Sequence, residues 1–131
     1  MELPLYQYHS LQPGYIRLLQ FLPDGISRMR HVNLKNRSSH VGYAALSYTW
    51  GASTETFPFQ CDAQNLPVRE NLLHALSQLK NQIDTPIWID AMCINQSDEV
   101  EKMSQLQMMT DIYRSANKVL IWLGKEIPEI K

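Results

Sequence analysis

The chain has 131 residues, 44% of them hydrophobic and 19% charged, which is the composition of one folded globular domain. Its 12 lysines and arginines stand against 13 aspartates and glutamates, and this balance argues against a nucleic-acid partner, because such binding depends on cations that neutralise phosphates. The first residues lack the basic start and apolar core of a secretory signal, and no apolar run approaches the roughly 18–20 residues that span a bilayer. We therefore expect a cytoplasmic protein without a membrane partner.

The N-terminal third predicts an arm followed by a hairpin. Residues 1–14 are polar, aromatic and interrupted by proline, so we expect an N-terminal arm there and the domain itself over residues 15–131. The apolar run of residues 16–22 predicts a strand, which ends at the turn signal of residues 23–25. Residues 26–34 predict the second strand of an N-terminal β-hairpin.

The segment Tyr43–Trp50, with the sequence YAALSYTW, predicts a strand in the middle of a sheet. Every second residue from Ala44 to Trp50 becomes bulkier, whereas the residues between them are small. Small side chains on one face let a helix pack closely against it, as in a sheet that is covered on both sides. A short strand is also predicted over residues 57–61.

A helix and a very apolar strand are predicted next. Leucines recur at helical spacing over residues 70–82, which predicts an amphipathic helix. The break at Thr85-Pro86 precedes residues 87–90, whose sequence IWID predicts a buried strand.

Residues 98–117 form the most strongly predicted helix. Asp98 with Glu101 three residues later fits a capping box in its looser aspartate form. Residues 118–123, KVLIWL, predict a third apolar strand. The apolar stripe expected to pack this helix onto the sheet consists of Val100, Met103, Leu106, Met109, Ile112, Tyr113 and Ala116.

The order of these elements predicts the fold class. From Tyr43 onward it is strand, helix, strand, helix, strand, and this alternation is typical of a parallel α/β sheet with right-handed crossovers. The carboxyl ends of such strands meet at one edge of the sheet, where ligands bind.

Three segments of the chain carry distinctive motifs. Residues 45–51 fit the pattern "ALSYxWG", and residues 88–105 fit "WIDxxCINQxDxxEKxxQ". Residues 109–124 fit "MxxIYxxAxxVxxWLG". Together and in this order the three blocks resemble those of the fungal heterokaryon-incompatibility (HET) domain family, and the resemblance covers about residues 16–124.

The resemblance implies cell-death signalling in fungal non-self recognition, a form of innate immunity. It also implies a TIR-like (flavodoxin-like) parallel sheet flanked by helices, with the N-terminal β-hairpin added. Several TIR domains cleave NAD, with a catalytic glutamate on the helix after the third strand. The chain ends at Lys131, seven residues past Gly124, so we expect that helix to be missing.

Polar and aromatic side chains follow two of the predicted strands. Cleaving the nicotinamide–ribose bond needs a carboxylate, hydroxyl-binding groups and an aromatic surface, and Asp90 and Glu101 are the candidate catalytic residues. NAD would be a substrate, with no permanently bound cofactor. The candidate binding residues are Tyr48, Trp50, Gly51, Cys93, Asn95, Gln96 and Lys102.

Each candidate has a structural alternative. Asp90 equally suits bonding to backbone N–H groups in the next loop, and Glu101 suits closure of the capping box. Trp50 suits either stacking on a base or plugging the end of the sheet. Cys93 has no histidine partner at a recognisable spacing, which favours a small buried residue over a nucleophile. Lys102, with Asn95 and a helix N-terminus, suits a pyrophosphate.

Two functional hypotheses follow from the sequence. In the first, the full-length domain is an NAD glycohydrolase that acts on NAD or a related nucleotide. In the second, it is a non-catalytic module that signals by self-association, with protein partners recruited through other domains of a longer chain. No metal is expected, because the cysteines and histidines lack ligand spacing.

Overall fold

The computed structural model describes residues 3–36, 42–48 and 53–122. None of the helices in these ranges has the length and apolar character that crossing a membrane requires. In chain order the elements are β1 (Tyr15–Phe21), β2 (Ser27–Asn33), β3 (Ala44–Tyr48), β4 (Thr56–Cys61), β5 (Gln64–Arg69), α1 (Glu70–Leu79), β6 (Ile87–Ile89), α2 (Asp90–Cys93), α3 (Glu99–Ser115) and β7 (Lys118–Trp122).

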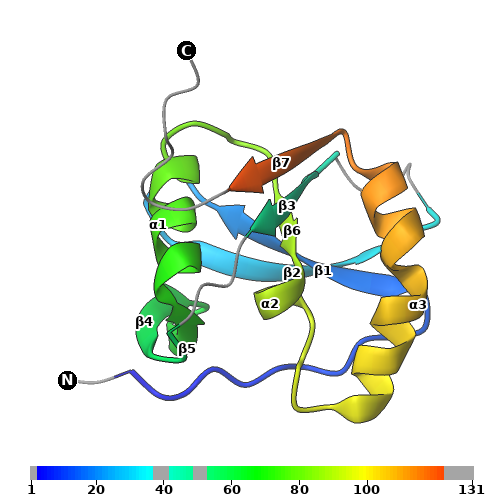
Figure 1. The fold of residues 1–131 in the computed structure, drawn as a ribbon, viewed down its shortest axis with the longest axis horizontal. Coiled ribbons are helices and arrows are strands. Elements are labelled where there is room, and N and C mark those ends of the chain that lie inside the picture. The colour runs from blue at the N-terminus through cyan, green and yellow to red at the C-terminus, as the bar shows by residue number, and fades with distance from the viewer. Residues whose placement is uncertain (1–2, 37–41, 49–52, 123–131) are drawn as a thin grey trace.

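A five-stranded sheet forms the centre of the molecule, with the strand order β2-β1-β6-β3-β7 (Figure 1). Strand β3 pairs in parallel with β6 on one side and with β7 on the other. The hairpin β1–β2 joins this parallel core through an antiparallel contact between β1 and β6. The predicted α/β architecture with an N-terminal hairpin is therefore confirmed, and the whole sheet is mixed.

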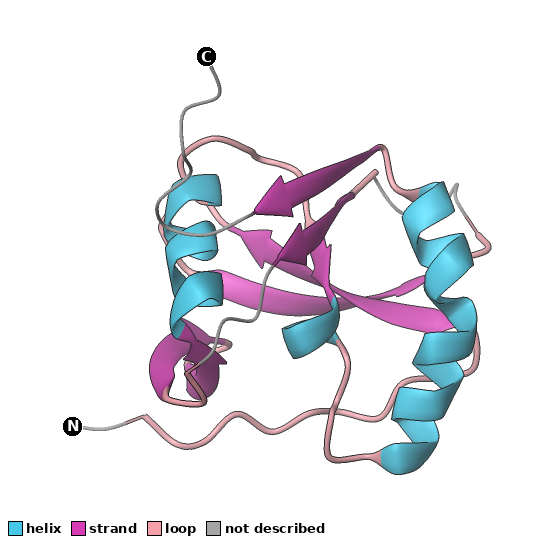
Figure 2. Ribbon diagram, in the orientation of Figure 1, coloured by secondary structure: helices cyan, strands magenta, loops and turns pink. Residues whose placement is uncertain are grey.

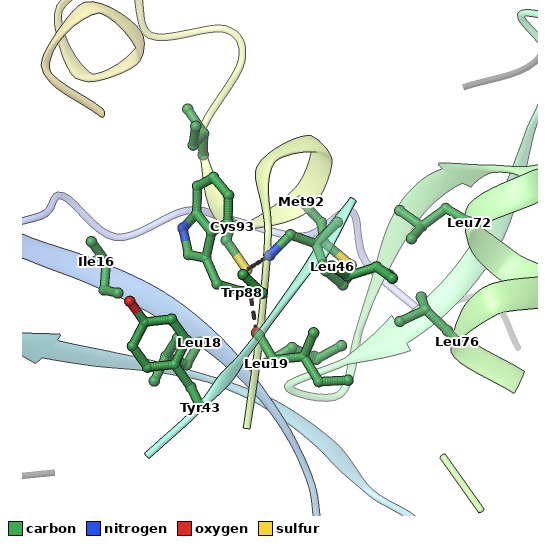
Figure 3. Packing of buried hydrophobic residues seen from close by; sticks show 14 of the residues in the cluster. Ile16, Leu18, Leu19, Tyr43, Leu46, Leu72, Leu76, Trp88, Met92 and Cys93 are labelled. Carbon is green, nitrogen blue, oxygen red and sulfur yellow. Dashed lines mark hydrogen bonds between the residues drawn. The ribbon is translucent and has the colours of Figure 1, made fainter. Parts of the chain in front are cut away.

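Helices α1 and α3 lie on opposite sides of this sheet (Figure 2). Tyr43 and Trp88 face α3: the Tyr43 hydroxyl donates a hydrogen bond to the Ile112 carbonyl, and the Trp88 ring meets the Tyr113 ring edge-on at 5.4 Å. The register pairs Ala45 with Trp88, so the small residue gives the indole room. Leu46 points the other way, towards α1 (Figure 3).

A second hairpin, β4–β5, lies between β3 and α1 in the chain. Only its first strand was predicted. The turn places Asp62 and Ala63 at φ values of 53° and 58°, as the tight turns of two-residue hairpins require, but without the usual glycine or asparagine. Pro67 inside β5 further weakens the strand signal. The N-terminal arm extends this hairpin, since Leu5 pairs in parallel with Asn65.

Helix α3 docks on the sheet differently from the prediction. Val100, Met103 and Leu106 of the predicted stripe are 82%, 59% and 48% exposed. The buried face carries Ile112 together with Gln105, whose amide donates to the carbonyl of Tyr15 at 3.1 Å. The predicted stripe was therefore wrong for Val100, Met103 and Leu106, because apolar spacing does not reveal polar partners on the sheet. Its second half was right, since Met109, Ile112, Tyr113 and Ala116 all pack on the core.

Candidate functional site

A hollow of about 130 Å³ lies at the carboxyl ends of β3 and β6. Tyr48 is the last residue of β3, and Ala91 and Gln96 follow β6. The structure thus brings the ends of the two strands to one cavity. Trp50 and Gly51, the other candidates after β3, lie outside the described residues. The lining residues are Tyr48, Thr56, Pro67, Val68, Arg69, Leu72, Ala91 and Gln96.

Asp90 does not line this hollow itself, but it directly precedes Ala91, which does. It is the first residue of α2, so β6 ends one residue earlier than predicted. Burial raises the pKa of the Asp90 carboxyl above its ordinary value, although a hydrogen bond from the backbone of Ala91 opposes the shift. Gln96 is tied to the same residue, because its side-chain amide donates to the Asp90 carbonyl at 2.9 Å.

The Tyr48 phenol is affected by the charges of both Asp90 and Arg69. Burial raises the pKa of the Tyr48 phenol, the negative charge of Asp90 raises it further, and the positive charge of Arg69 lowers it. Both charges therefore act on the tyrosine that ends β3. The hollow accordingly combines an aromatic ring, a carboxamide, a guanidinium and a neighbouring carboxyl group.

Arg69 was not predicted as a site residue. It ends β5 and occupies the N-cap position of α1, where its own side chain does not cap the helix. Its place depends on the β4–β5 hairpin, which carries it to the edge of the hollow. Because β5 had no clear signal in the sequence, neither did the position of this arginine.

Glu101 lies in a different environment. Asp98 caps α3 as predicted, since its carboxylate accepts from the backbone N–H groups of Val100 and Glu101, both at 3.1 Å. We expected the Glu101 carboxylate to close the capping box by accepting from the backbone N–H of Asp98, and this prediction was wrong. The Glu101 carboxylate instead accepts from the backbone N–H of Asn95 at 2.6 Å.

Arg17 is the principal partner of Glu101, and sequence reasoning missed it as well. Its guanidinium donates to the two carboxylate oxygens at 2.6 and 2.8 Å, in the paired geometry that this side chain favours. The side chains of Arg17 and Glu101 are 1% and 9% exposed, so the ion pair is buried. Within the apolar run of residues 16–22, nothing in the sequence indicated that the arginine points inward.

The two candidate carboxylates do not share a cavity. Glu101 lines a separate hollow of about 230 Å³, between residues 10–14 of the arm and the first turns of α3. Tyr48 and Gln96 line the other hollow, next to Asp90. The structure therefore supports one carboxyl group near the strand ends, whereas the sequence suggested two.

The other candidates surround the loop between α2 and α3. Cys93 is completely buried, and burial raises the pKa of its thiol to about 12, which leaves almost no thiolate near neutral pH. The Asn95 side chain accepts from the backbone N–H of Ser97 at 3.2 Å. Lys102 lies on α3 and donates its backbone N–H to the Asp98 carbonyl at 2.8 Å. Within the described ranges, no group of three or more acidic, histidine or cysteine side chains is arranged to hold a metal ion.

Comparison with known proteins gives a consistent result. The family model described as "Heterokaryon incompatibility protein (HET)" matches residues 43–130. The protein "Heterokaryon incompatibility protein 6, OR allele" of Neurospora crassa is 38% identical over 101 residues, which are 66% of this chain and 15% of that protein. The chain thus matches only a small part of this longer relative. No solved structure matches it significantly.

Proposed function

Because this chain belongs to the heterokaryon incompatibility (HET) family, we propose that it acts in fungal incompatibility and cell-death signalling through hydrolysis of NAD. The site would be the hollow at the carboxyl ends of β3 and β6. One observation carries the mechanistic part of this proposal: Tyr48, Arg69 and Gln96 line one cavity, and Asp90 lies beside them.

The strand order supports a TIR-like, flavodoxin-like arrangement. Counted along the chain, the parallel strands β3, β6 and β7 are first, second and third, and they lie in the order second-first-third. Flavodoxin-like folds begin with the same order, and they bind ligands outside the carboxyl ends of the strands, where the order reverses. Here the order reverses between β3 and β7, and Tyr48, at the end of β3, lies both next to that point and in the lining of the hollow.

The residues suit the nicotinamide end of a dinucleotide and its pyrophosphate. A hollow of about 130 Å³ is smaller than the roughly 300–1,000 Å³ of complete small-molecule sites, so we propose that only the nicotinamide ring and its ribose enter. The ring would lie against Tyr48, and the amide of Gln96 would meet ribose hydroxyls. Arg69, at the N-cap position of α1, would take the pyrophosphate in place of Lys102.

The reaction breaks the bond between the ribose carbon and the nicotinamide nitrogen. Nicotinamide leaves with the bonding electron pair, and water adds to the ribosyl cation with loss of a proton. We assign stabilisation of that cation to the ionised Asp90 carboxylate, because fixed charges act strongly where solvent is partly excluded. Glu101 would act indirectly, since its oxygens bind Arg17 and Asn95.

Release of nicotinamide from NAD tests this proposal. We expect the wild-type domain, within its full-length parent protein, to release nicotinamide, and Asp90→Asn to lower the rate by about a hundredfold or more. The control is Asp84→Asn, a change at an exposed aspartate before β6, which should leave the rate unchanged. Absence of release by the wild-type protein, or equal rates for Asp90→Asn and wild type, would contradict NAD hydrolysis.

A non-catalytic role in self-association is the second candidate function. It is favoured by the exposed apolar side chains Val100, Met103 and Leu106 of α3, and by Ile121 of β7, which is 69% exposed. Sedimentation of wild type and Leu106→Glu would test it. Concentration-dependent assembly that Leu106→Glu abolishes, together with cell death that persists in Asp90→Asn, would favour this function over hydrolysis.

A further inference from the structure

The buried arginine of β1 contacts both ends of the loop that leads from α2 to α3. Besides its two bonds to Glu101, the Arg17 guanidinium donates to the carbonyl of Cys93 at 3.0 Å. Cys93 is the last residue of α2, and Glu101 lies in the first turn of α3. A buried charge is unfavourable unless its hydrogen-bond partners stay in place around it. The guanidinium therefore holds both ends of the loop at fixed positions.

The loop itself is tied to the same ion pair. Oxygen Oε2 of Glu101 accepts from Arg17 and also from the backbone N–H of Asn95, both at 2.6 Å. The next residue, Gln96, lines the hollow and donates to the carbonyl of Asp90. One carboxylate therefore connects a buried strand with a residue adjacent to the candidate site.

The N-terminal arm completes this set of contacts. The carbonyl of His9 accepts from Arg17 at 2.7 Å, and the ring of Tyr8 lies 4.8 Å from the guanidinium carbon. The Tyr8 hydroxyl donates to the carbonyl of Met92 in α2 at 2.7 Å. These arm residues precede the part of the chain that the family model matches.

From these contacts we infer that Arg17 is a positioning residue: acting through Glu101 and Cys93, it fixes the loop that carries Gln96, and the arm residues Tyr8 and His9 hold it in place. The arm would thus set the geometry of the hollow without touching a ligand there. The consequence for turnover rests on the proposed hydrolysis of NAD, whereas the ordering of the loop does not.

Amide hydrogen exchange followed by NMR tests the structural step directly. In wild type we expect the Asn95 amide, bonded to a carboxylate, to exchange at least about tenfold more slowly than the Ser97 amide, whose bond to the Asn95 side chain is exposed. In Glu101→Gln the Asn95 amide should exchange about tenfold or more faster and shift upfield, because the charged acceptor is lost.

The matched control is Gln105→Met, one turn further along α3. It removes a partly buried bond to the Tyr15 carbonyl on β1 but touches neither the loop nor Arg17, so the Asn95 amide should stay as in wild type. Tyr8→Phe keeps the ring over the guanidinium and loses only the bond to Met92. We expect it to speed exchange at Asn95 by a smaller factor, and Tyr8→Ala by a larger one.

Turnover measured on the same variants separates the two proposals. We expect Glu101→Gln and Tyr8→Ala to lower kcat for nicotinamide release more than Gln105→Met does at equal folded fraction. Changed exchange at Asn95 without any wild-type release would remove hydrolysis and leave the positioning of the loop intact. An Asn95 amide that exchanges as fast as Ser97 in wild type, or is unmoved in both Glu101→Gln and Tyr8→Ala, would overturn the inference. Unaltered kcat in variants with a loosened loop would overturn its link to activity.

Discussion

The surroundings of Asp90 and Glu101 differ although the two residues lie only eleven positions apart in the chain. Glu101 is held by Arg17 and by the backbone of Asn95, inside a buried network. Asp90 begins a one-turn helix beside a hollow, and burial raises the pKa of its carboxyl. A carboxylate with several donors is stabilised in place, whereas one that is partly desolvated and has few donors stays available for chemistry. One continuous motif can thus supply a structural ion pair and a site residue.

Removal of the Glu101 carboxylate should have the largest effect on stability. Glu101→Ala leaves the Arg17 guanidinium buried without its counter-charge, and breaking a buried pair in this way costs about 3–5 kcal/mol. Urea unfolding of Glu101→Ala and wild type would measure the difference. A loss below about 1 kcal/mol would mean that solvent or another group compensates, and that the two carboxylates do not differ as described.

Replacing both Arg17 and Glu101 should lower the free energy of unfolding by less than the sum of the two single replacements. In Arg17→Met with Glu101→Leu no unpaired charge remains, so we expect a favourable coupling of about 1–3 kcal/mol in a double-mutant cycle. The cycle requires unfolding free energies for Arg17→Met, Glu101→Leu and the double variant. Strict additivity would show that the ion pair is not the interaction that fixes the loop.

Asp90→Asn should change the free energy of unfolding by a smaller amount, and it should raise it. Because burial raises the pKa of Asp90 above its ordinary value of 3.8, the folded state binds this proton more tightly than the unfolded state. The contribution of Asp90 to stability therefore falls as the pH rises through the folded pKa. We expect Asp90→Asn to be more stable than wild type at neutral pH, with the difference vanishing below the ordinary carboxyl pKa. Equal stability at every pH would contradict the raised pKa.

Glu99 provides the baseline for both residues. It lies in the first turn of α3, two positions before Glu101, and it is exposed. Glu99→Gln should cost no more than about 0.5 kcal/mol, since it removes only a favourable interaction with the helix dipole. Thermal unfolding at low and high salt would check this value. A cost that approaches that of Glu101→Ala would point to a general charge effect at this helix end.

The sequence predicted the parts of the fold that depend on local pattern. The strand predicted in Tyr43–Trp50 was recovered over Ala44–Tyr48, and the capping residue Asp98 was recovered as well, because strand pattern and cap chemistry are local signals. Strand β5 was missed because its turn uses Ala63 at positive φ, where glycine or asparagine is usual. The outward face of α3 was missed because its docking partners, Arg17 and Tyr15, lie some 80 to 90 residues away in the chain.

The candidate site was also predicted only in part, because its local signals are visible in the sequence and its long-range pairs are not. Tyr48 and Gln96 do meet at one hollow, as expected for residues at the ends of adjacent parallel strands. The sequence grouped Glu101 with them, since its spacing from Asp98 fits a helix start that faces the crevice. In the structure Glu101 does not line this hollow but binds Arg17, because a buried guanidinium needs a carboxylate partner. Such long-range pairs have no periodic signature in a single sequence.

An NMR titration of the wild-type domain with NAD tests the central claim most directly, because it shows where the nucleotide binds whether or not it is cleaved. We expect the amide signals of Arg69, Ala91 and Gln96 to shift in proportion to saturation, while those of Gln12 and Ser104, at the hollow beside Glu101, stay in place. Shifts confined to Gln12 and Ser104, or none at millimolar NAD, would contradict the assignment of the site to the ends of β3 and β6.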